Sequence, residues 1–263
     1  MIINGLKINY RIIGEGRPFL IFHGWGSCSE KWQKVGELLT QNGLKVIIPD
    51  LPGFGQSQKP SKPWNLDDYC NFIEEFIKFL NLNKFFLLGH SFGGALAVKY
   101  SLKFPEKINK LFLVGAACIR KKTIKVRLLR AISKFFNHPP LFIKKVFYRK
   151  SDYLSVEGVM KETYLKIIEE DLSDDLSQIL VPTVLILGEK DKITPVKQAF
   201  FINLKIQNFS LRSPYERCPE GTEISRRETK LKIIPKVSHS PHLESPKELS
   251  SLILKELSSL ESL

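Results

Sequence analysis

Residues 85–94 read FFLLGHSFGG, a short apolar run that ends at a glycine and leads directly into the helix-like run Phe92–Lys103. A serine held on a sharp turn between a strand and a helix has a strained backbone, and it tolerates only small neighbours two residues away on either side. Gly89 and Gly93 occupy both of these positions. The stretch therefore predicts a buried strand followed by a nucleophile elbow, with Ser91 at the turn.

Apolar runs of similar length occur on both sides of this stretch, and they alternate with segments whose apolar residues recur every three or four positions. This alternation is typical of an α/β fold in which helices cover both faces of a mostly parallel central sheet. The expected strands are Phe19–Phe22, Val46–Ile48, Phe85–Leu88, Leu111–Val114, Val184–Leu187 and Leu231–Ile234. The expected helices are Lys31–Gln41, Leu66–Leu80, Phe92–Lys103 and Pro246–Leu260.

Local signals refine this plan at three places. Asn65 or Asp67 could cap the helix that begins at Leu66. Pro246 suits the first turn of the last helix. The segment Ile2–Ile13 contains a turn at Asn4-Gly5 followed by alternating side chains, which predicts an antiparallel pair of strands at the edge of the sheet.

The regular alternation breaks between Ala116 and Val181, where the pattern is helical throughout. We interpret residues 116–181 as a helical insertion between two strands of a core formed by residues 1–115 and 182–263. Within that core, residues 205–230 are polar and rich in turn-forming residues, so they predict an irregular loop insertion.

The composition excludes several classes of protein. With 263 residues, 43% of them hydrophobic and 25% charged, the chain resembles an ordinary globular protein rather than a disordered one. No run approaches the roughly eighteen uninterrupted apolar residues of a spanning helix, and the first residues alternate where a signal peptide would be continuously apolar. We therefore expect no transmembrane segment and a cytoplasmic location. Cysteines 28, 70, 118 and 218 lack CxxC spacing, which argues against a zinc site or a disulfide framework.

The formal net charge of +13 is concentrated in one segment of the chain. Eleven basic residues and no acidic ones lie between Arg120 and Lys150, inside the expected insertion, and the rest of the chain is nearly neutral. Such a segment can attract an acidic protein, an anionic ligand, a membrane surface or nucleic acid. It also fits two helices that each have an apolar core face and a solvated lysine face. We expect no nucleic-acid partner, because the sequence carries no recognisable binding motif.

A serine hydroxyl becomes a good nucleophile only when a base takes its proton and an acid orients that base. Asp191 follows the strand-like run VLIL, and His239 follows the expected strand Leu231–Ile234. Both would lie at the carboxyl edge of the sheet, where they could reach the serine hydroxyl. Glu189 is an alternative acid and His242 an alternative base.

Ester cleavage through a serine also requires backbone donors for the developing oxyanion. One should be the amide of Phe92, directly after the nucleophile. The other should come from His23-Gly24-Trp25-Gly26 after the strand FLIF, and we assign it to the amide of Trp25. Passive roles are expected for the other histidines: His23 and His90 should satisfy backbone groups, and His138 should lie at the surface.

Five motifs occur in the same order as in a known superfamily: HGWG at 23–26, PDLPGFGQS at 49–57, GHSFGG at 89–94, GEKDKITP at 188–195 and SHSPHLESP at 238–246. Together they resemble the α/β-hydrolase superfamily in its small serine esterase branch, which includes carboxylesterases and the pimeloyl carrier-protein methyl ester esterase group. The resemblance covers nearly the whole chain except the insertion and the 205–230 loop, and it implies that residues 116–181 form a cap over the pocket.

The same resemblance implies a triad of Ser91, Asp191 and His239, with the amides of Trp25 and Phe92 as the oxyanion hole. Two features depart from the pattern: the 205–230 loop is unusually long, and Ser238 stands where the family often has glycine.

The expected reaction is hydrolysis of a carboxylic ester through an acyl-enzyme intermediate, with no metal and no organic cofactor. Alternatives are a thioesterase or a hydrolase of acyl esters linked to a carrier protein, for which the basic cap would bind an acidic carrier protein or an anionic substrate. An alternative of another class is a non-catalytic receptor for a small ligand, although such a receptor would gain nothing obvious from a complete triad.

Overall fold

The computed structural model describes residues 1–120, 157–208 and 228–258 of the chain. Its main sheet has the strand order β3-β5-β4-β6-β7-β8-β9, and every neighbouring pair runs parallel except β3 and β5. The strands are β1 (Ile2–Ile3), β2 (Leu6–Lys7), β3 (Tyr10–Ile13), β4 (Arg17–Phe22), β5 (Leu44–Pro49), β6 (Phe85–His90), β7 (Ile108–Val114), β8 (Thr183–Gly188) and β9 (Thr229–Ile234). The predicted α/β class with a mostly parallel sheet is therefore confirmed.

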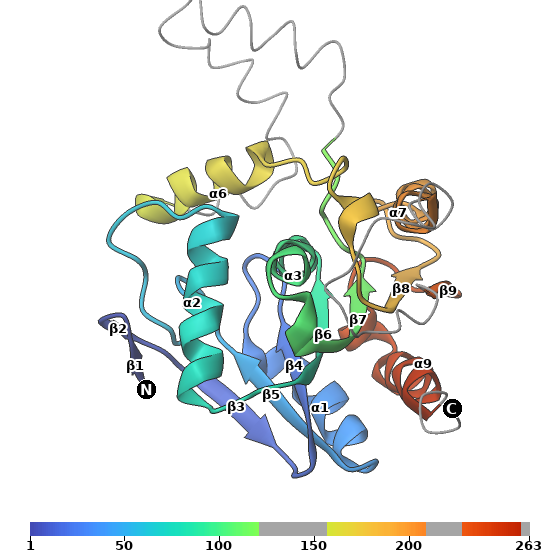
Figure 1. The fold of residues 1–263 in the computed structure, drawn as a ribbon, viewed down its shortest axis with the longest axis horizontal. Helices are drawn as coiled ribbons and strands as arrows, with labels where there is room; N and C mark the ends of the chain where they lie inside the picture. Colours follow the sequence, from blue (N-terminus) through green and yellow to red (C-terminus); the bar gives the residue numbers. More distant parts are fainter. Residues whose placement is uncertain (121–156, 209–227, 259–263) are drawn as a thin grey trace, which may run out of the picture.

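Helices cover both faces of this sheet (Figure 1). The α-helices are α1 (Gln33–Thr40), α2 (Leu66–Phe79), α3 (Phe92–Lys103), α6 (Val159–Glu169), α7 (Val196–Asn208), α8 (Pro241–Glu244) and α9 (Pro246–Ser258), and the short 3₁₀ helices are η1 (Ser29–Trp32), η2 (Pro105–Lys107) and η4 (Leu176–Gln178). Among the described residues no helix combines the length and the apolar character needed to cross a bilayer.

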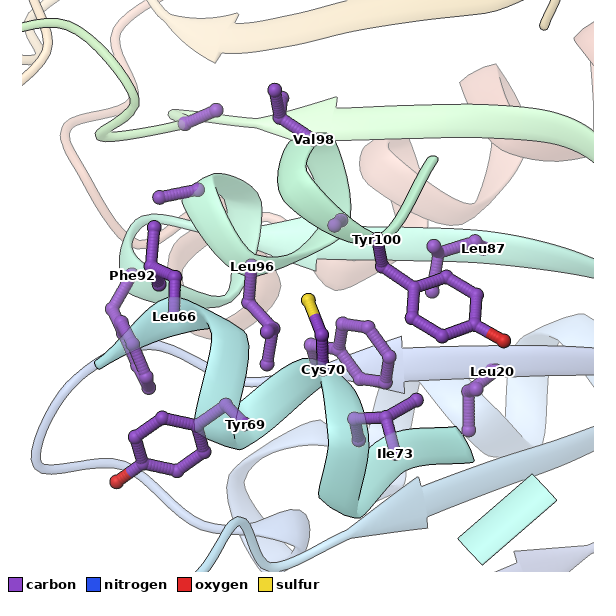
Figure 2. Packing of buried hydrophobic residues seen from close by; sticks show 14 of the residues in the cluster. Leu20, Leu66, Tyr69, Cys70, Ile73, Leu87, Phe92, Leu96, Val98 and Tyr100 are labelled. Carbon is purple, nitrogen blue, oxygen red and sulfur yellow. The ribbon is translucent and has the colours of Figure 1, made fainter. Parts of the chain in front are cut away.

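Two hydrophobic clusters fix the helices to the sheet. Figure 2 shows the first, in which side chains of α2 and α3, including Ile73 and Leu96, gather over Leu20 and Leu87 of the sheet. The second cluster lies on the opposite face and includes Trp32, residues of α1 and the buried stripe of α9. Because strand β6 is buried along its whole length between these layers, its carboxyl end is a rigid place for a functional residue.

The structure shows which residue caps α2 and what the Asn4-Gly5 turn connects. Asn65 is the cap of α2: its side chain accepts a hydrogen bond from the Asp68 amide at 2.9 Å, and the Asp68 carboxylate accepts one from the Asn65 amide. The Asn4-Gly5 turn joins β1 and β2 into a separate two-stranded sheet, and β3 forms the antiparallel edge of the main sheet.

Two expectations about irregular regions need correction. Helix α7 continues to Asn208, and β9 begins at Thr229, so both ends of the expected 205–230 loop are regular structure. The helix continues because Ile202 and Ile206 extend its buried face by one more turn. The insertion is not helical throughout: residues 116–120 and 170–175 are irregular, with the Leu172 amide donating to the Cys118 carbonyl at 3.0 Å. Residues 121–156 of the expected cap and residues 209–227 of the loop lie outside the described residues, as do His138 and Cys218.

Candidate active site

Ser91 lies at the turn between β6 and α3, with backbone angles φ 52° and ψ −113°. A residue other than glycine adopts a positive φ only at a cost in free energy, so the surroundings must hold it there. Here the Ser91 amide donates to the Val114 carbonyl at 3.1 Å, and the Ser91 carbonyl accepts from the amides of Gly94 and Ala117, both at 3.0 Å. The strained turn is therefore fixed by the adjoining strand and the adjoining helix.

The two glycines that flank the serine are required by close backbone contacts. A β-carbon on Gly93 would lie 2.2 Å from the carbonyl oxygen of Phe22 and 2.5 Å from that of His23. A β-carbon on Gly89 would lie 2.2 Å from the carbonyl oxygen of Gly93. Because backbone atoms cannot move aside as a flexible side chain can, only glycine fits at either position.

The structure brings Ser91, His239 and Asp191 together in one hydrogen-bonded chain. The Nε2 atom of His239 lies 3.0 Å from Oγ of Ser91, and its Nδ1 atom lies 2.7 Å from Oδ2 of Asp191. Since a carboxylate accepts the Nδ1 proton, Nε2 is left with the lone pair that can accept the serine proton. This is the geometry that a general base and its nucleophile require.

Asp191 is buried, with an exposed fraction of 5%. Its Oδ1 atom accepts from the amides of Ile193 at 2.8 Å and Thr194 at 2.9 Å, and its Oδ2 atom accepts from the Thr194 hydroxyl at 2.6 Å. Burial by itself would raise the pKa of Asp191, but the hydrogen bonds from His239 and Thr194 hold that pKa below its usual range. The carboxylate is therefore charged and fixed in orientation at neutral pH. The alternative acid, Glu189, is exposed and accepts from the amide of Lys236.

Three further histidines surround the site, and burial keeps each of them neutral. Burial lowers the pKa of His23 and of His90 to about 4, and that of His242 to about 2. His23 donates from Nδ1 to the Gly24 carbonyl and accepts the Leu51 amide at Nε2, as expected of a residue that satisfies backbone groups.

His90 and His242 hold the loop that carries the candidate base. His90 donates from Nε2 to the backbone carbonyl of His239 at 2.8 Å, so it ties that loop to the nucleophile turn. His242 stacks on Trp32 with ring centroids 4.3 Å apart, whereas His239 is the histidine that contacts Ser91.

The two candidate oxyanion donors belong to the first residue of α3 and to the loop that packs against the elbow. The amide of Phe92 is the first of α3 and so has no acceptor within that helix. Gly24 packs so tightly against the elbow that a β-carbon on it would lie 3.4 Å from Cβ of Ser91. The amide of Trp25 follows this contact directly, in a turn closed by the Ser27 amide and the Gly24 carbonyl at 3.1 Å.

Aromatic side chains form one wall beside this turn. The Trp25 ring makes edge contacts with Phe54, Phe92 and Tyr164, at centroid distances of 4.8, 5.5 and 5.0 Å respectively. An open pocket of about 560 Å³ adjoins Trp25 and is lined in part by Phe54 and Met160. Tyr164 and Met160 belong to α6, so the described part of the insertion does contribute to the surroundings of the site.

Sequence reasoning did not assign roles to Thr194 or Asp50. Thr194 follows Asp191 by three residues, the spacing at which an aspartate often binds the backbone of its own turn. Asp50 accepts from the amides of Ser29 at 2.6 Å and Gln56 at 3.0 Å, and so joins the two loops that follow β4 and β5. Asp50 binds groups that are remote in sequence, so no local signal could identify its role.

Comparisons with known proteins agree with this architecture. The sequence model of the alpha/beta hydrolase fold matches residues 17–138. The pimeloyl-[acyl-carrier protein] methyl ester esterase of Wigglesworthia glossinidia brevipalpis is 31% identical, over 90% of this chain and 92% of that protein. The chain belongs to the α/β-hydrolase family. Other relatives of this chain are named as lipases.

Other matches are shorter or more distant. An uncharacterized protein of Mycobacterium tuberculosis is 34% identical over 119 residues, which are 45% of this hydrolase but only 35% of that relative's length. Among solved structures, an esterase from Exiguobacterium antarcticum superimposes with a TM-score of 0.72 at 22% identity, covering 98% of this chain and 97% of that one. At this identity the structural likeness supports the fold alone.

Proposed function

We propose that this α/β hydrolase cleaves carboxylic esters through an acyl-enzyme formed on Ser91. The observation that carries the proposal is the chain of hydrogen bonds from Ser91 through His239 to Asp191, at 3.0 and 2.7 Å. A serine on a strained turn, an imidazole within hydrogen-bond distance of it and a buried charged carboxylate are the three components that serine acyl transfer needs.

In the first half of the reaction, Oγ of Ser91 attacks the ester carbonyl carbon while Nε2 of His239 takes the hydroxyl proton. The carbonyl π electrons move onto oxygen, where the amides of Trp25 and Phe92 donate to the oxyanion. Collapse of this intermediate breaks the carbon–oxygen bond to the alcohol, which leaves with the proton from His239. Asp191 stays ionised and stabilises the imidazolium.

In the second half, His239 takes a proton from water, and the resulting hydroxide attacks the acyl carbon. The same amides hold the second oxyanion, and its collapse returns the proton to Oγ of Ser91 and releases the carboxylic acid. Every proton moves through His239, so the sequence of steps needs no metal and no organic cofactor.

A second candidate is hydrolysis of an acyl ester linked to an acidic carrier protein. It is favoured by the 31% identity to a pimeloyl-[acyl-carrier protein] methyl ester esterase, together with the basic segment Arg120–Lys150. Arg120 is excluded from a docking role, because its guanidinium donates to the carbonyls of Ile167 and Glu170 within the fold. The other basic residues of that segment lie outside the described residues.

The activity is tested with p-nitrophenyl esters of increasing acyl length, using Ser91→Ala as the control. We expect turnover by the wild type, and a loss of about 10⁶-fold in kcat for the variant, as is typical when a triad nucleophile is removed. A fluorophosphonate should add one covalent adduct to the wild type and none to the variant. If the folded wild type hydrolyses no ester and forms no fluorophosphonate adduct, the proposed esterase activity is contradicted. The non-catalytic receptor for a small ligand would then be the better reading of the fold.

The carrier-linked alternative is tested by comparing a free methyl ester with the same acyl group on an acyl carrier protein. In the variant Arg127→Glu, Arg130→Glu, Lys134→Glu, we expect kcat/KM to fall selectively on the carrier-linked ester. Equal losses on both esters would contradict a docking role for these residues.

A further inference from the structure

Helix α7 carries apolar residues on both of its faces. Its inner face packs on the core through Ala199, Ile202 and Ile206. Its outer face presents Phe200, Phe201 and Leu204, with exposed fractions of 50%, 42% and 54%. Large apolar side chains on the outer face of a helix are expected to meet another apolar phase, and α7 lies at the outer edge of the fold beside β8 and β9 (Figure 1).

The apolar stripe extends beyond the helix toward the candidate active site. Ile193, three residues before α7 begins, is 66% exposed. Ile193 lies in the bend between β8 and α7, next to the exposed Lys192. The connection that carries Ile193 also carries Asp191 and Thr194, so the stripe begins next to the triad.

The outer face of α9 differs from that of α7. Lys247, Glu248, Ser251, Lys255 and Ser258 are the exposed positions of that helix, and all of them are polar. The solvent-facing side of α9 therefore carries only polar residues, whereas that of α7 carries three large apolar ones. Phe200, Phe201 and Leu204 gather three exposed apolar side chains on one face of a helix, and such clustering indicates a binding surface.

Lysines surround the apolar stripe. Lys190, Lys192 and Lys197 are exposed, and the ammonium of Lys205 lies 5.5 Å above the ring of Phe201. Asp191 is the one acidic residue between positions 190 and 208, and it is buried and bound to His239. Apolar side chains flanked by cations match the interface of an anionic bilayer, where rings enter the headgroup layer and ammonium groups meet lipid phosphates.

We propose that this docking stripe, formed by Ile193, Lys197, Phe200, Phe201 and Leu204, seats the protein on the surface of an anionic lipid bilayer. The stripe lies on the ridge of a helix, and a lipid surface accepts a ridge without a matching groove. A second copy of the chain would bring Lys197 and Lys205 against their counterparts, so self-association through this face would be opposed by charge. Docking goes beyond ester cleavage, and it would hold the edge of the sheet that carries Asp191 close to the bilayer.

The test is sedimentation of the full-length protein with vesicles of phosphatidylcholine alone, or with 30% phosphatidylglycerol, at low and high salt. We expect binding to the anionic vesicles that weakens as salt rises. Phe200→Ser with Leu204→Ser should lower the partition coefficient about tenfold or more, because two exposed apolar side chains lose their contact with lipid. Lys192→Glu with Lys197→Glu should remove the preference for anionic vesicles.

Phe79→Ser is the matched control, since Phe79 is 59% exposed at the end of α2, away from α7. This variant should bind vesicles like the wild type. Ser91→Ala should also bind like the wild type while losing ester hydrolysis, which separates a failure of docking from a failure of the proposed reaction.

Three results would overturn the proposal: no binding to anionic vesicles, an equal loss of binding in the Phe79 variant, or a wild-type dimer that the Phe200 and Leu204 changes dissociate. A sharp fall in melting temperature for those changes would also contradict it, because it would show that the stripe is covered by the protein itself.

Discussion

The candidate nucleophile and its candidate base are held in place in different ways. Ser91 is positioned by backbone packing: a strand buried along its length ends at a turn whose neighbours are glycines in van der Waals contact with other backbone. His239 follows the half-buried edge strand β9, and side chains fix its loop. His90 binds the His239 carbonyl, and the Glu244 carboxylate accepts from the amides of Ser238 and Ser240.

This difference implies that damage to the two regions should have different consequences. Packing around Ser91 is part of the core, so a change there should cost stability before it costs chemistry. The loops of Asp191 and His239 lie at the rim, so a lost hydrogen bond there should leave the fold in place and change the rate or the pH dependence of stability. The following predictions test that division.

Gly93→Ala should have the largest effect, because the new β-carbon would meet the Phe22 and His23 carbonyl oxygens at 2.2 and 2.5 Å. We expect a loss of about 4 kcal/mol or more in the free energy of unfolding, measured by urea denaturation. Gly26→Ala, in the loop that follows β4, is the control, since its φ is +65° but nothing lies within 4 Å of an added β-carbon. It should cost only about 1 kcal/mol. If both variants lost the same free energy of unfolding, the conformation of the elbow would not depend on close packing at Gly93.

Asp191→Asn should have the next largest effect, on rate rather than on folding. An amide in place of the carboxylate can hold His239 in the wrong tautomer, so kcat for ester hydrolysis should fall by about 10⁴-fold. KM should change little, and circular dichroism should show the wild-type fold. A loss below about tenfold would mean that His239 does not depend on Asp191, and Glu189→Gln should leave the rate unchanged in the same assay.

The division between backbone and side-chain positioning also explains what sequence reasoning could predict. The central strands and the elbow depend on neighbours within a few residues, so periodicity and small-residue spacing were enough to identify them, and they narrowed the cap of α2 to Asn65 or Asp67. The contact of Asp50 with Ser29 and that of His90 with His239 join segments far apart in the chain, and no local pattern encodes them. Helix α7 was not among the predicted helices, and its last turn was assigned to the 205–230 loop because polar Lys205 and Gln207 concealed the buried Ile206.

His90→Leu should have an intermediate effect and tests how the base is positioned. Leucine removes the donor to the His239 carbonyl while keeping a buried apolar volume. A shift of about 1 Å in a catalytic group can cost about 100-fold, so we expect kcat to fall between about 10- and 100-fold with KM nearly unchanged.

His90→Gln serves as the rescue variant, because its side-chain amide can still donate to the same carbonyl. It should recover most of kcat and most of the rate of fluorophosphonate labelling. If leucine and glutamine lower kcat equally while both variants remain folded, the hydrogen bond does not position the base.

Thr194→Val should have the smallest effect, and its dependence on pH distinguishes it from a packing change. The Thr194 hydroxyl donates to Oδ2 of Asp191, so removing it raises the pKa of Asp191 in the folded state toward its unfolded value. A carboxylate whose folded pKa is depressed stabilises the protein above the unfolded pKa, and that stabilisation is lost as pH falls through the folded value. The variant should therefore be less stable than the wild type at pH 7, by about 1.5–3 kcal/mol for a hydrogen bond to a charged group.

At a pH low enough to protonate Asp191 in both proteins, much of this difference should disappear, as measured by urea midpoints from pH 7 downward. The effect on kcat should stay below about tenfold, because the amides of Ile193 and Thr194 still hold Oδ1 of Asp191. A stability difference that is the same at every pH would assign Thr194 to packing alone. A pH-dependent difference with a nearly intact rate would place the rim of the site under electrostatic control, in contrast to the sterically fixed turn at Ser91.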